Sequence, residues 1–264
     1  MKNLILVIAF LTFNYTVNAQ KEIIGIVEYQ NIVNNENGVS FATPYKLHFN
    51  STISLYTREG KGEQIKNKES ENKIEGGGTI SEHKIMKSST PMAYYYTNNS
   101  ASELIFRETI VDKLYEVEDS IESISWKLHS KHKKIGMYSC QKATAKYRGR
   151  EYTVWFTSEI PISHGPWKLR GLPGLILEVT EETGKFEFRA IKIDVQPDRK
   201  EVLEKLNKPV INKITDMTTY KKVLENKFEE TVAKLKASLP RGTKLVTDCD
   251  VCPDPKNHSL ERFK

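Results

Sequence analysis

Residues 161–179 constrain the fold of this chain more than any other stretch. Their sequence, PISHGPWKLRGLPGLILEV, places prolines, glycines and a tryptophan just before an unbroken apolar run. Pro173 and Gly174 suit the two central positions of a type II turn, because proline presets the first φ angle and glycine accepts a positive φ at the second. Residues 175–177 are then expected to form a strand that leaves this turn.

The stretch Gly171-Leu172-Pro173-Gly174-Leu175-Ile176 resembles the motif that names the GLPGLI family, a group of secreted Bacteroidota proteins. Trp126 and residues 136–143 and 152–161 are also similar to family members, and the resemblance spans roughly residues 23–193. It implies export and a structural centre at the motif, but it brings no catalytic residues or biochemical role. We expect a structural role for ten residues of this region: Cys140, Pro161, Gly165, Pro166, Gly171, Leu172, Pro173, Gly174, Leu175 and Ile176.

The first residues of the chain indicate export. Lys2 supplies a short basic region, residues 4–13 are almost wholly apolar, and Val17-Asn18-Ala19 offers the small residues that a signal peptidase recognises. We expect cleavage after Ala19 and delivery to the periplasm or the cell exterior. No later apolar stretch approaches the roughly 18 residues of a transmembrane helix, so no membrane span is expected.

The composition, 38% hydrophobic and 28% charged, is typical of a globular protein and not of a disordered one. Loss of the signal peptide removes Lys2 and lowers the formal charge from +6 to +5, which weakly favours acidic partners. Nucleic acid is not an expected partner, because lysine and glutamate are interspersed. The expected organisation is a signal peptide (1–19), a β-rich domain (20–240) and a cysteine-containing tail (241–264).

The polar and apolar residues alternate in many short runs from residue 24 to residue 195. The alternation is clearest over residues 45–50 and is typical of half-buried strands. Gly149 is expected in a hairpin turn. Residues 58–89 lose the alternation and become rich in lysine, glutamate, asparagine and glycine, which indicates a surface loop. Short strands separated by polar turns predict one antiparallel sheet or an open barrel.

The chain changes character near residue 216. Apolar residues then recur at intervals of three or four, followed by Pro240: Met217, Tyr220, Leu224, Phe228, Val232, Leu235 and Leu239. This spacing predicts an amphipathic helix over residues 216–239 that docks on the sheet. The expected fold is mainly β with α (α+β), a twisted antiparallel sheet or half-barrel with this helix packed on it. The architecture is similar to the half-barrel of periplasmic lipoprotein carriers.

Cys249, Cys252 and His258 lie close together near the C-terminus. Two thiols and an imidazole at this spacing could bind copper or zinc. The favoured alternative is an ordinary disulfide, either between these two cysteines or from one of them to Cys140, because export places the chain in an oxidising compartment. No other cofactor is expected.

The candidate catalytic groups are Cys140 and, further along the chain, Ser163 and His164, which are adjacent to each other. A thiol nucleophile would need a histidine base beside it, and we favour a buried strand position for Cys140. The Ser163-His164 pair lacks the Gly-x-Ser-x-Gly elbow of hydrolases. Gly165-Pro166-Trp167 is expected to form a rigid corner whose indole covers the sheet, with His164 at its polar rim.

Aromatic residues indicate the function better than the candidate catalytic groups do. Tyr152, Val154 and Phe156 should lie on one face of a strand and Trp155 on the other, so that both faces need cover. Packing in the core is favoured for any single aromatic residue. If a half-barrel leaves its concave face open, the candidates for ligand contact are Trp126, Tyr152, Trp155, Phe156, His164 and Trp167.

Two functions from different classes follow. The first is an exported, non-enzymatic binding or accessory protein of the cell envelope that recognises a hydrophobic, lipid-like or peptide ligand or a partner protein. The alternative is a periplasmic metal-handling protein that uses Cys249, Cys252 and His258. A cysteine or serine hydrolase would require Cys140 or Ser163 to have a histidine within hydrogen-bonding reach.

Overall fold

The structure is a computed structural model that describes residues 22–35, 38–60, 63–67, 83–87, 92–211, 213–238 and 259–263. The first seven strands are β1 (Gly25–Asn34), β2 (Ser40–Phe49), β3 (Ile53–Arg58), β4 (Glu63–Asn67), β5 (His83–Lys87), β6 (Tyr94–Asn98) and β7 (Glu103–Ile110). The next seven are β8 (Lys113–Ser120), β9 (Lys127–Ile135), β10 (Tyr138–Tyr147), β11 (Arg150–Thr157), β12 (Leu175–Glu181), β13 (Phe186–Asp194) and β14 (Ile214–Thr215). The helices are α2 (Arg199–Lys205) and α3 (Met217–Ser238).

Twelve of these strands form one large sheet in the order β14-β8-β7-β6-β3-β2-β1-β13-β12-β11-β10-β9. Neighbours are antiparallel, except that β14 runs parallel to β8. Strand β1 joins two arms: the first arm continues through β2, β3, β6, β7 and β8, and the second through β13, β12, β11, β10 and β9. Within the described residues β14 and β9 do not pair, so the sheet does not close into a barrel. The predicted β-rich α+β class is confirmed.

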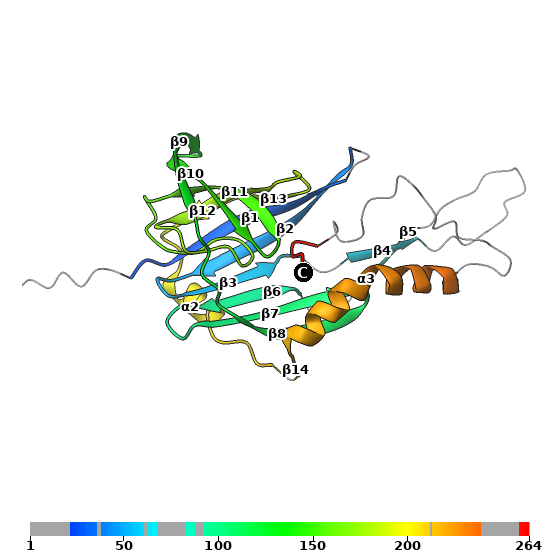
Figure 1. The fold of residues 1–264 in the computed structure, drawn as a ribbon. Coiled ribbons are helices and arrows are strands. Elements are labelled where there is room, and N and C mark those ends of the chain that lie inside the picture. Colours follow the sequence, from blue (N-terminus) through cyan, green and yellow to red (C-terminus); the bar gives the residue numbers. More distant parts are fainter. Residues whose placement is uncertain are drawn as a thin grey trace, which may run out of the picture.

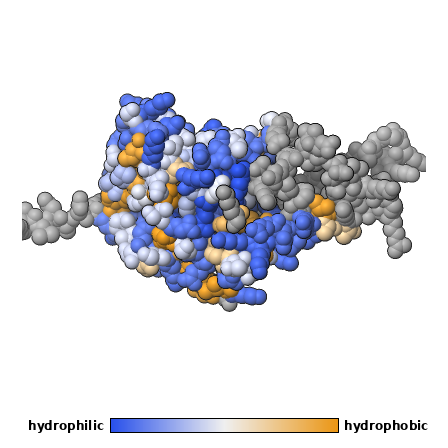
Figure 2. Space-filling model, in the orientation of Figure 1, coloured by the Kyte–Doolittle hydropathy of each residue, from blue (hydrophilic) through white to orange (hydrophobic). Residues whose placement is uncertain are grey.

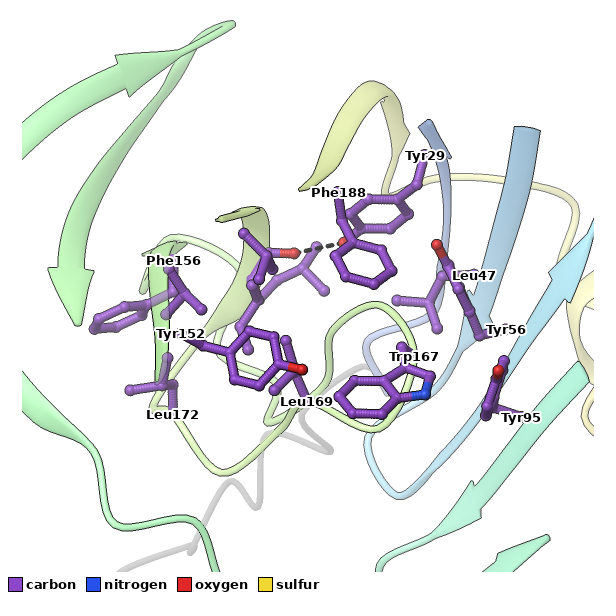
Figure 3. Packing of buried hydrophobic residues seen from close by; sticks show 14 of the residues in the cluster. Tyr29, Leu47, Tyr56, Tyr95, Tyr152, Phe156, Trp167, Leu169, Leu172 and Phe188 are labelled. Carbon is purple, nitrogen blue, oxygen red and sulfur yellow. Dashed lines mark hydrogen bonds between the residues drawn. The ribbon is translucent and has the colours of Figure 1, made fainter. Parts of the chain in front are cut away.

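The two arms lie over each other and enclose the main core (Figure 1). Buried side chains from both arms form one cluster, which includes Val27 of β1, Leu47, Tyr56 and Phe106 of the first arm, and Val154, Leu177 and Phe188 of the second. Figure 3 shows the aromatic rings of this cluster facing inward from several strands. The Tyr29 hydroxyl donates to the carbonyl of Ile176 at 2.5 Å and so ties β1 to β12.

Helix α2 covers the opposite face of the first arm. Val202 and Leu206 pack there against Leu55, Tyr94, Tyr96 and Ile105 in a second, smaller cluster. Tyr95 points to the main core instead, because successive side chains of a strand alternate between its faces. The first arm is therefore buried on both sides at β6.

Helix α3 confirms the predicted amphipathic helix within a residue at each end. Its first turns dock on β7 and β8. Tyr220 is 1% exposed, and its ring meets Phe106 edge-on with centroids 5.0 Å apart. Met217 and Leu224 pack against the same core. The apolar spacing therefore predicted the docked face correctly for these three residues, whereas the side chains of Phe228, Leu235 and Leu239 lie outside the described part of the structure.

The hairpin expected at Gly149 is confirmed, because the turn between β10 and β11 consists of Arg148 and Gly149. Their φ angles are +49° and +77°. Positive φ at both central residues is the conformation that matches the twist of a two-residue hairpin.

The surface loop expected over residues 58–89 is wrong in part. β4 and β5 lie within it and pair antiparallel, with Ile65 opposite Ile85. Both strands are mostly polar, so they lack the alternation of apolar residues that identifies a strand in sequence.

The type II turn expected at Pro173 and Gly174 is also wrong. Gly174 does not have a positive φ, whereas Gly171 does, at +93°. A Cβ on Gly174 would lie 2.1 Å from the carbonyl oxygen of Thr157. Glycine is required here by the close approach of β11, and not by the geometry of a turn. The strand expected after it is confirmed as β12, in which residues 175–177 are fully buried.

The face of the molecule shown in Figure 2 is mostly hydrophilic, with apolar side chains in small separate patches. Within the described ranges, no helix is both long and apolar enough to cross a bilayer.

Candidate functional site

The last described residues of the chain, Ser259–Phe263, lie between the two arms and close to where Figure 1 marks the C-terminus. We call them the terminal segment. Four residues hold it through hydrogen bonds and are called the seat: Arg148, Arg150, Tyr152 and Lys168. Three of them surround the β10–β11 turn, and the fourth follows Trp167 in the glycine- and proline-rich stretch before β12.

Arg150 and Tyr152 bind the backbone of the terminal segment. The guanidinium of Arg150 donates to the Ser259 carbonyl at 2.8 and 2.6 Å. The Tyr152 hydroxyl donates to the Leu260 carbonyl at 2.8 Å. Arg150 also donates to the carboxylate of Glu181, and neither side chain of this ion pair has any exposed surface. The pair therefore fixes the guanidinium that holds the segment.

The turn itself makes the next contact. The amide of Arg262 donates to the Arg148 carbonyl at 2.8 Å. A Cβ on Gly149 would lie 2.2 Å from the Arg262 carbonyl oxygen, so the segment lies directly against this glycine. The side chain of Arg148 turns inward, where it donates to both oxygens of Asp119 at 2.9 and 3.1 Å.

Lys168 binds a side chain of the segment. Its ammonium group has no exposed surface and donates to Glu261 at 2.7 Å and to Asp119 at 3.1 Å. The same nitrogen lies 3.7 Å from the centroid of the Phe106 ring, a cation–π distance. The carboxylate of Glu261 has one oxygen, Oε2, without a hydrogen-bond partner in the described residues.

Burial and charge act in opposite directions on this ion pair. Burial lowers the pKa of Lys168, but the negative charges of Glu261 and Asp119 outweigh it and hold the pKa above its ordinary value. Lys168 is therefore a cation at neutral pH. Burial raises the pKa of Glu261 against the opposing effect of Lys168. A buried ammonium of this kind requires anionic partners.

A second carboxylate network lies beside Lys168. The hydroxyls of Tyr95 and Tyr220 both donate to Glu108, the latter at 2.6 Å. Burial is the largest cause that raises the pKa of both tyrosines. Strand β7 and helix α3 thus meet through a hydrogen-bonded acid next to the seat.

The structure brings together three of the six residues predicted to contact a ligand. Tyr152, Phe156 and Trp167 all belong to the main core and appear together in Figure 3. The Trp167 ring lies 5.9 Å from that of Tyr147 and 6.0 Å from that of Tyr152, between centroids. The expected corner at Gly165-Pro166-Trp167 therefore does bury its indole against the sheet, although Trp167 needs a φ of +58° to do so.

Trp126 and Trp155 are only partly buried and pack against the same cluster. Trp126 is half-buried and donates through Nε1 to the Arg170 carbonyl at 2.8 Å. Trp155 is half-buried on the outer face of β11, as predicted from the alternation, where Lys133 lies 4.5 Å from its ring centroid. Neither indole belongs to the seat.

The polar rim expected at His164 is wrong. His164 is 1% exposed, and neither ring nitrogen has a hydrogen-bond partner of ordinary geometry, although the backbone of Asn50 lies nearby. Burial lowers the pKa of this imidazole to about 4. The space between it, Ser54 and Lys168 has no room for a water molecule. Trp167, Leu169 and Leu172 of the same stretch are buried in the main core, and His164 is enclosed with them although it was expected at the surface.

Among the residues that the structure describes, neither hydrolase candidate has a histidine as a hydrogen-bond partner. Ser163 Oγ accepts from the amide of Gly171 at 3.0 Å, which closes the turn before the motif. Cys140 is a free thiol with no exposed surface in β10, as favoured from the sequence. Burial raises the pKa of Cys140 to about 11, which keeps the thiol protonated at neutral pH.

The remaining residues expected to shape the motif divide between core and surface. Leu172, Leu175 and Ile176 are buried, and Gly165 lies so close to Leu169 and Ile176 that a Cβ would be within 2.9 Å of both. Pro161, Gly171 and Pro173 are exposed, and Pro166 and Gly174 are buried.

Cys249, Cys252 and His258 lie outside the described residues, so the metal and disulfide alternatives there stay predictions. In the parts of the chain that the structure describes, no three histidine, cysteine, aspartate or glutamate side chains gather in a way that could hold a metal ion.

Of the seat, the sequence identified only Tyr152, as a candidate for ligand contact. Lys168, like the neighbouring Arg170, does interrupt an apolar, turn-rich stretch, and a charge in such a place is a signal for a buried partner. Arg148 and Arg150 gave no signal, because they look like ordinary hairpin residues, and Glu261 of the terminal segment lies 93 positions from Lys168.

Comparison with known proteins gives a family. The family model described as "N-glycanase peptide, N-terminal domain" matches residues 62–222, which is more than half of the chain. No curated protein matches. Two solved structures of PNGF-II, in space groups C2 and P21, are similar at 19% and 20% identity, with TM-scores of 0.50 and 0.48.

Both similarities cover 76% of this chain, which spans only about a third of the length of PNGF-II, 32% and 33% of the two solved chains. At this identity the first shows a common fold. The family model, which covers residues from β4 to α3, carries the assignment. The chain belongs to the family of N-glycanase peptide N-terminal domains.

Proposed function

We propose that this protein is an exported accessory module of the cell envelope that binds an extended peptide segment of a partner protein. The observation that supports it is the terminal segment itself, a five-residue stretch held between the arms through its own backbone carbonyls. Backbone-directed hydrogen bonds bind an extended peptide with little regard to its side chains.

The accessory role is supported by the family. The matching family is named for the N-terminal domain of an N-glycanase, and the solved relatives are about three times as long as the aligned region. A domain of this fold would act beside an enzyme or an envelope protein and supply recognition. The half-barrel interpretation belongs to the same proposal, with the interior between the arms as the binding site.

A peptide is a better candidate ligand than a lipid. The aromatic residues between the arms pack against one another, and the side chains that hold the segment by hydrogen bonds supply one guanidinium, one ammonium and one phenol as donors. Such donors match the carbonyl and carboxylate oxygens of a polypeptide.

The test is a random peptide library displayed on phage and selected against full-length protein with Glu261→Arg, a change that opposes Lys168 and frees the seat. Enriched peptides should bind saturably in fluorescence anisotropy and compete with one another. Replacing Tyr152 by Phe removes one donor to the peptide backbone, so we expect affinity to fall about 3- to 10-fold.

Tyr138→Phe is the matched control, because Tyr138 lies at the start of β10 away from the seat and should leave affinity unchanged. Circular dichroism confirms that each variant is folded. Peptides that bind equally well to the Tyr152→Phe and Tyr138→Phe proteins, or no saturable binding to the folded Glu261→Arg protein, would overturn the proposed function.

Three further expectations belong to this proposal. They are export with cleavage after Ala19, the relationship to the GLPGLI family, and a disulfide of the C-terminal tail, either between Cys249 and Cys252 or from one of them to Cys140. Native mass spectrometry of protein purified from the periplasm tests all of them except the family relationship. A bound copper or zinc ion with free thiols would favour the metal-handling alternative instead.

A further inference from the structure

The terminal segment is bound in the way that a peptide ligand is bound. Its hydrogen bonds with Arg150, Tyr152 and Arg148 all use backbone atoms of the segment, and Glu261 is its buried side chain. A ligand bound by backbone contacts and one anchoring side chain can be replaced by another of the same pattern.

The anchoring side chain carries the specificity. Lys168 is fully buried and donates to two carboxylates, of which Asp119 belongs to the sheet and Glu261 to the segment. Asp119 is also bound by Arg148, so the charge of Asp119 is shared between two cations. Without Glu261 the ammonium of Lys168 would lose one of its two anionic partners in the interior, and a neutral side chain would not replace it.

An aromatic position follows two residues later. Phe263 lies with its ring centroid 4.7 Å from the ammonium of Lys221 and 5.8 Å from the guanidinium of Arg148. These cations come from α3 and from the β10–β11 turn. A glutamate followed at the second position by an aromatic residue therefore meets cations at both points.

We infer that the terminal segment is a resident ligand, and that the seat exchanges it for a peptide segment of a partner protein that carries glutamate and, two residues later, an aromatic side chain. This rests on the proposed function and names its ligand class. A tethered ligand competes at an effective concentration of the order of millimolar, so the partner must displace the segment in order to bind.

The experiment measures the affinity of a fluorescein-labelled Ser-Leu-Glu-Arg-Phe peptide by anisotropy. Full-length Glu261→Arg protein should bind it at least 10-fold more tightly than wild type, in which the seat is occupied. The same peptide with glutamine in place of glutamate should bind the variant at least 10-fold more weakly. Adding Lys168→Met to the Glu261→Arg protein should abolish this preference.

Each contrary outcome has one meaning. Equal affinities of wild type and Glu261→Arg would overturn the exchange. Equal affinities of the glutamate and glutamine peptides, while library peptides still bind, would overturn the acidic specificity and leave the proposed function standing. Failure of every library peptide would overturn both.

A second measurement covers the case in which Glu261→Arg does not fold. A protease site inserted between Thr247 and Asp248 of the Cys249→Ser/Cys252→Ser protein is cut after folding, and the severed end, which no disulfide can then retain, is followed by mass spectrometry. An excess of the Ser-Leu-Glu-Arg-Phe peptide should displace the severed end, whereas the glutamine peptide should not. Retention of the severed end under both conditions would overturn the exchange.

Discussion

Arg150 and Glu181 form an ion pair between neighbouring strands of the second arm, and neither side chain has any exposed surface. The ring of Phe186 lies 5.0 Å from the guanidinium of Arg150 and covers it. A pair buried to this degree costs desolvation on both sides, so its net contribution to stability is small while both partners are present. The pair matters more for where the terminal segment lies than for stability, because the guanidinium that it fixes also binds the Ser259 carbonyl.

Breaking this pair from one side should therefore be costly. Arg150→Met leaves Glu181 buried with its charge uncompensated, and we expect the free energy of unfolding to fall by about 3 to 5 kcal/mol in urea titrations. The double variant Arg150→Met/Glu181→Leu should recover part of that loss. As a control, Arg189→Met removes an exposed pair with Glu187 and should cost less than about 1 kcal/mol. Equal costs for Arg150→Met and Arg189→Met would contradict the burial of the pair.

Gly174 should be intolerant of a side chain although its φ is ordinary. In Gly174→Ala the new Cβ would lie 2.1 Å from the Thr157 carbonyl oxygen. The three nearest atoms all belong to the backbone of Thr157 and Ser158, which cannot move aside as a flexible side chain could. We expect a loss of more than about 3 kcal/mol, in the range of severe core substitutions. Thermal and urea unfolding measure it.

Gly184 provides the matched comparison. It has a φ of +72° and nothing within 4 Å of the Cβ position, so Gly184→Ala tests backbone strain without a clash. The expected cost is about 1 to 2 kcal/mol. If Gly184→Ala lowered the free energy of unfolding more than Gly174→Ala, the close approach of β11 would not be the larger effect. Backbone conformation would then be the better explanation for a glycine at position 174.

His164 should make the protein less stable in acid. Burial lowers the pKa of His164 to about 4 from 6.5, so between these pH values the unfolded chain binds the additional proton. Stability supplied by the neutral imidazole is complete above pH 6.5 and is lost as the pH falls toward 4. The loss at pH 4.5 should be about 2 to 3 kcal/mol.

The measurement compares urea unfolding of wild type and His164→Asn at pH 7.5 and pH 4.5. Each protein gives one value for the free energy of unfolding that it loses between pH 7.5 and pH 4.5. Carboxylate protonation contributes equally to both losses, so the difference between the two losses is the contribution of the imidazole. A wild type and a variant that lose the same stability between these two pH values would show that His164 does not titrate in this range.

Local patterns predicted much of the fold. The alternation of polar and apolar residues identified the strands of both arms, and the spacing of Met217, Tyr220 and Leu224 identified α3 and its docked face. Gly149 was expected in a hairpin turn and lies in the turn between β10 and β11. These features depend on neighbours within a few residues, which is the range over which sequence patterns carry information.

The seat could not be predicted in the same way. The partners of Lys168 are Asp119 and Glu261, which lie 49 and 93 positions away. Burial of His164 likewise depends on the tertiary packing of residues 161–174 in the main core, which no local pattern of polar and apolar residues shows. Charged residues are assigned to the surface by default, and that default fails wherever distant partners compensate the charge.

Cys140 should be almost inert to thiol reagents in the native protein. The thiol has no exposed surface, and burial raises its pKa from 9.0 to about 11, which alone lowers the thiolate fraction at pH 8 about 100-fold. In the Cys249→Ser/Cys252→Ser protein, labelling with a chromogenic disulfide at pH 8 should therefore be at least 100-fold slower than in the same protein unfolded in urea. Rapid labelling of the folded variant would support an accessible, activated nucleophile.

The same reagent distinguishes the disulfide alternatives in the wild-type chain. If Cys140 is a free thiol, protein that is unfolded without reductant should take up label at Cys140, as peptide mapping would show. Any disulfide must then join Cys249 to Cys252. Failure to label Cys140 until a reductant is added would mean that one of these two cysteines is bonded to it, which would require β10 to open at the position where the thiol is now enclosed.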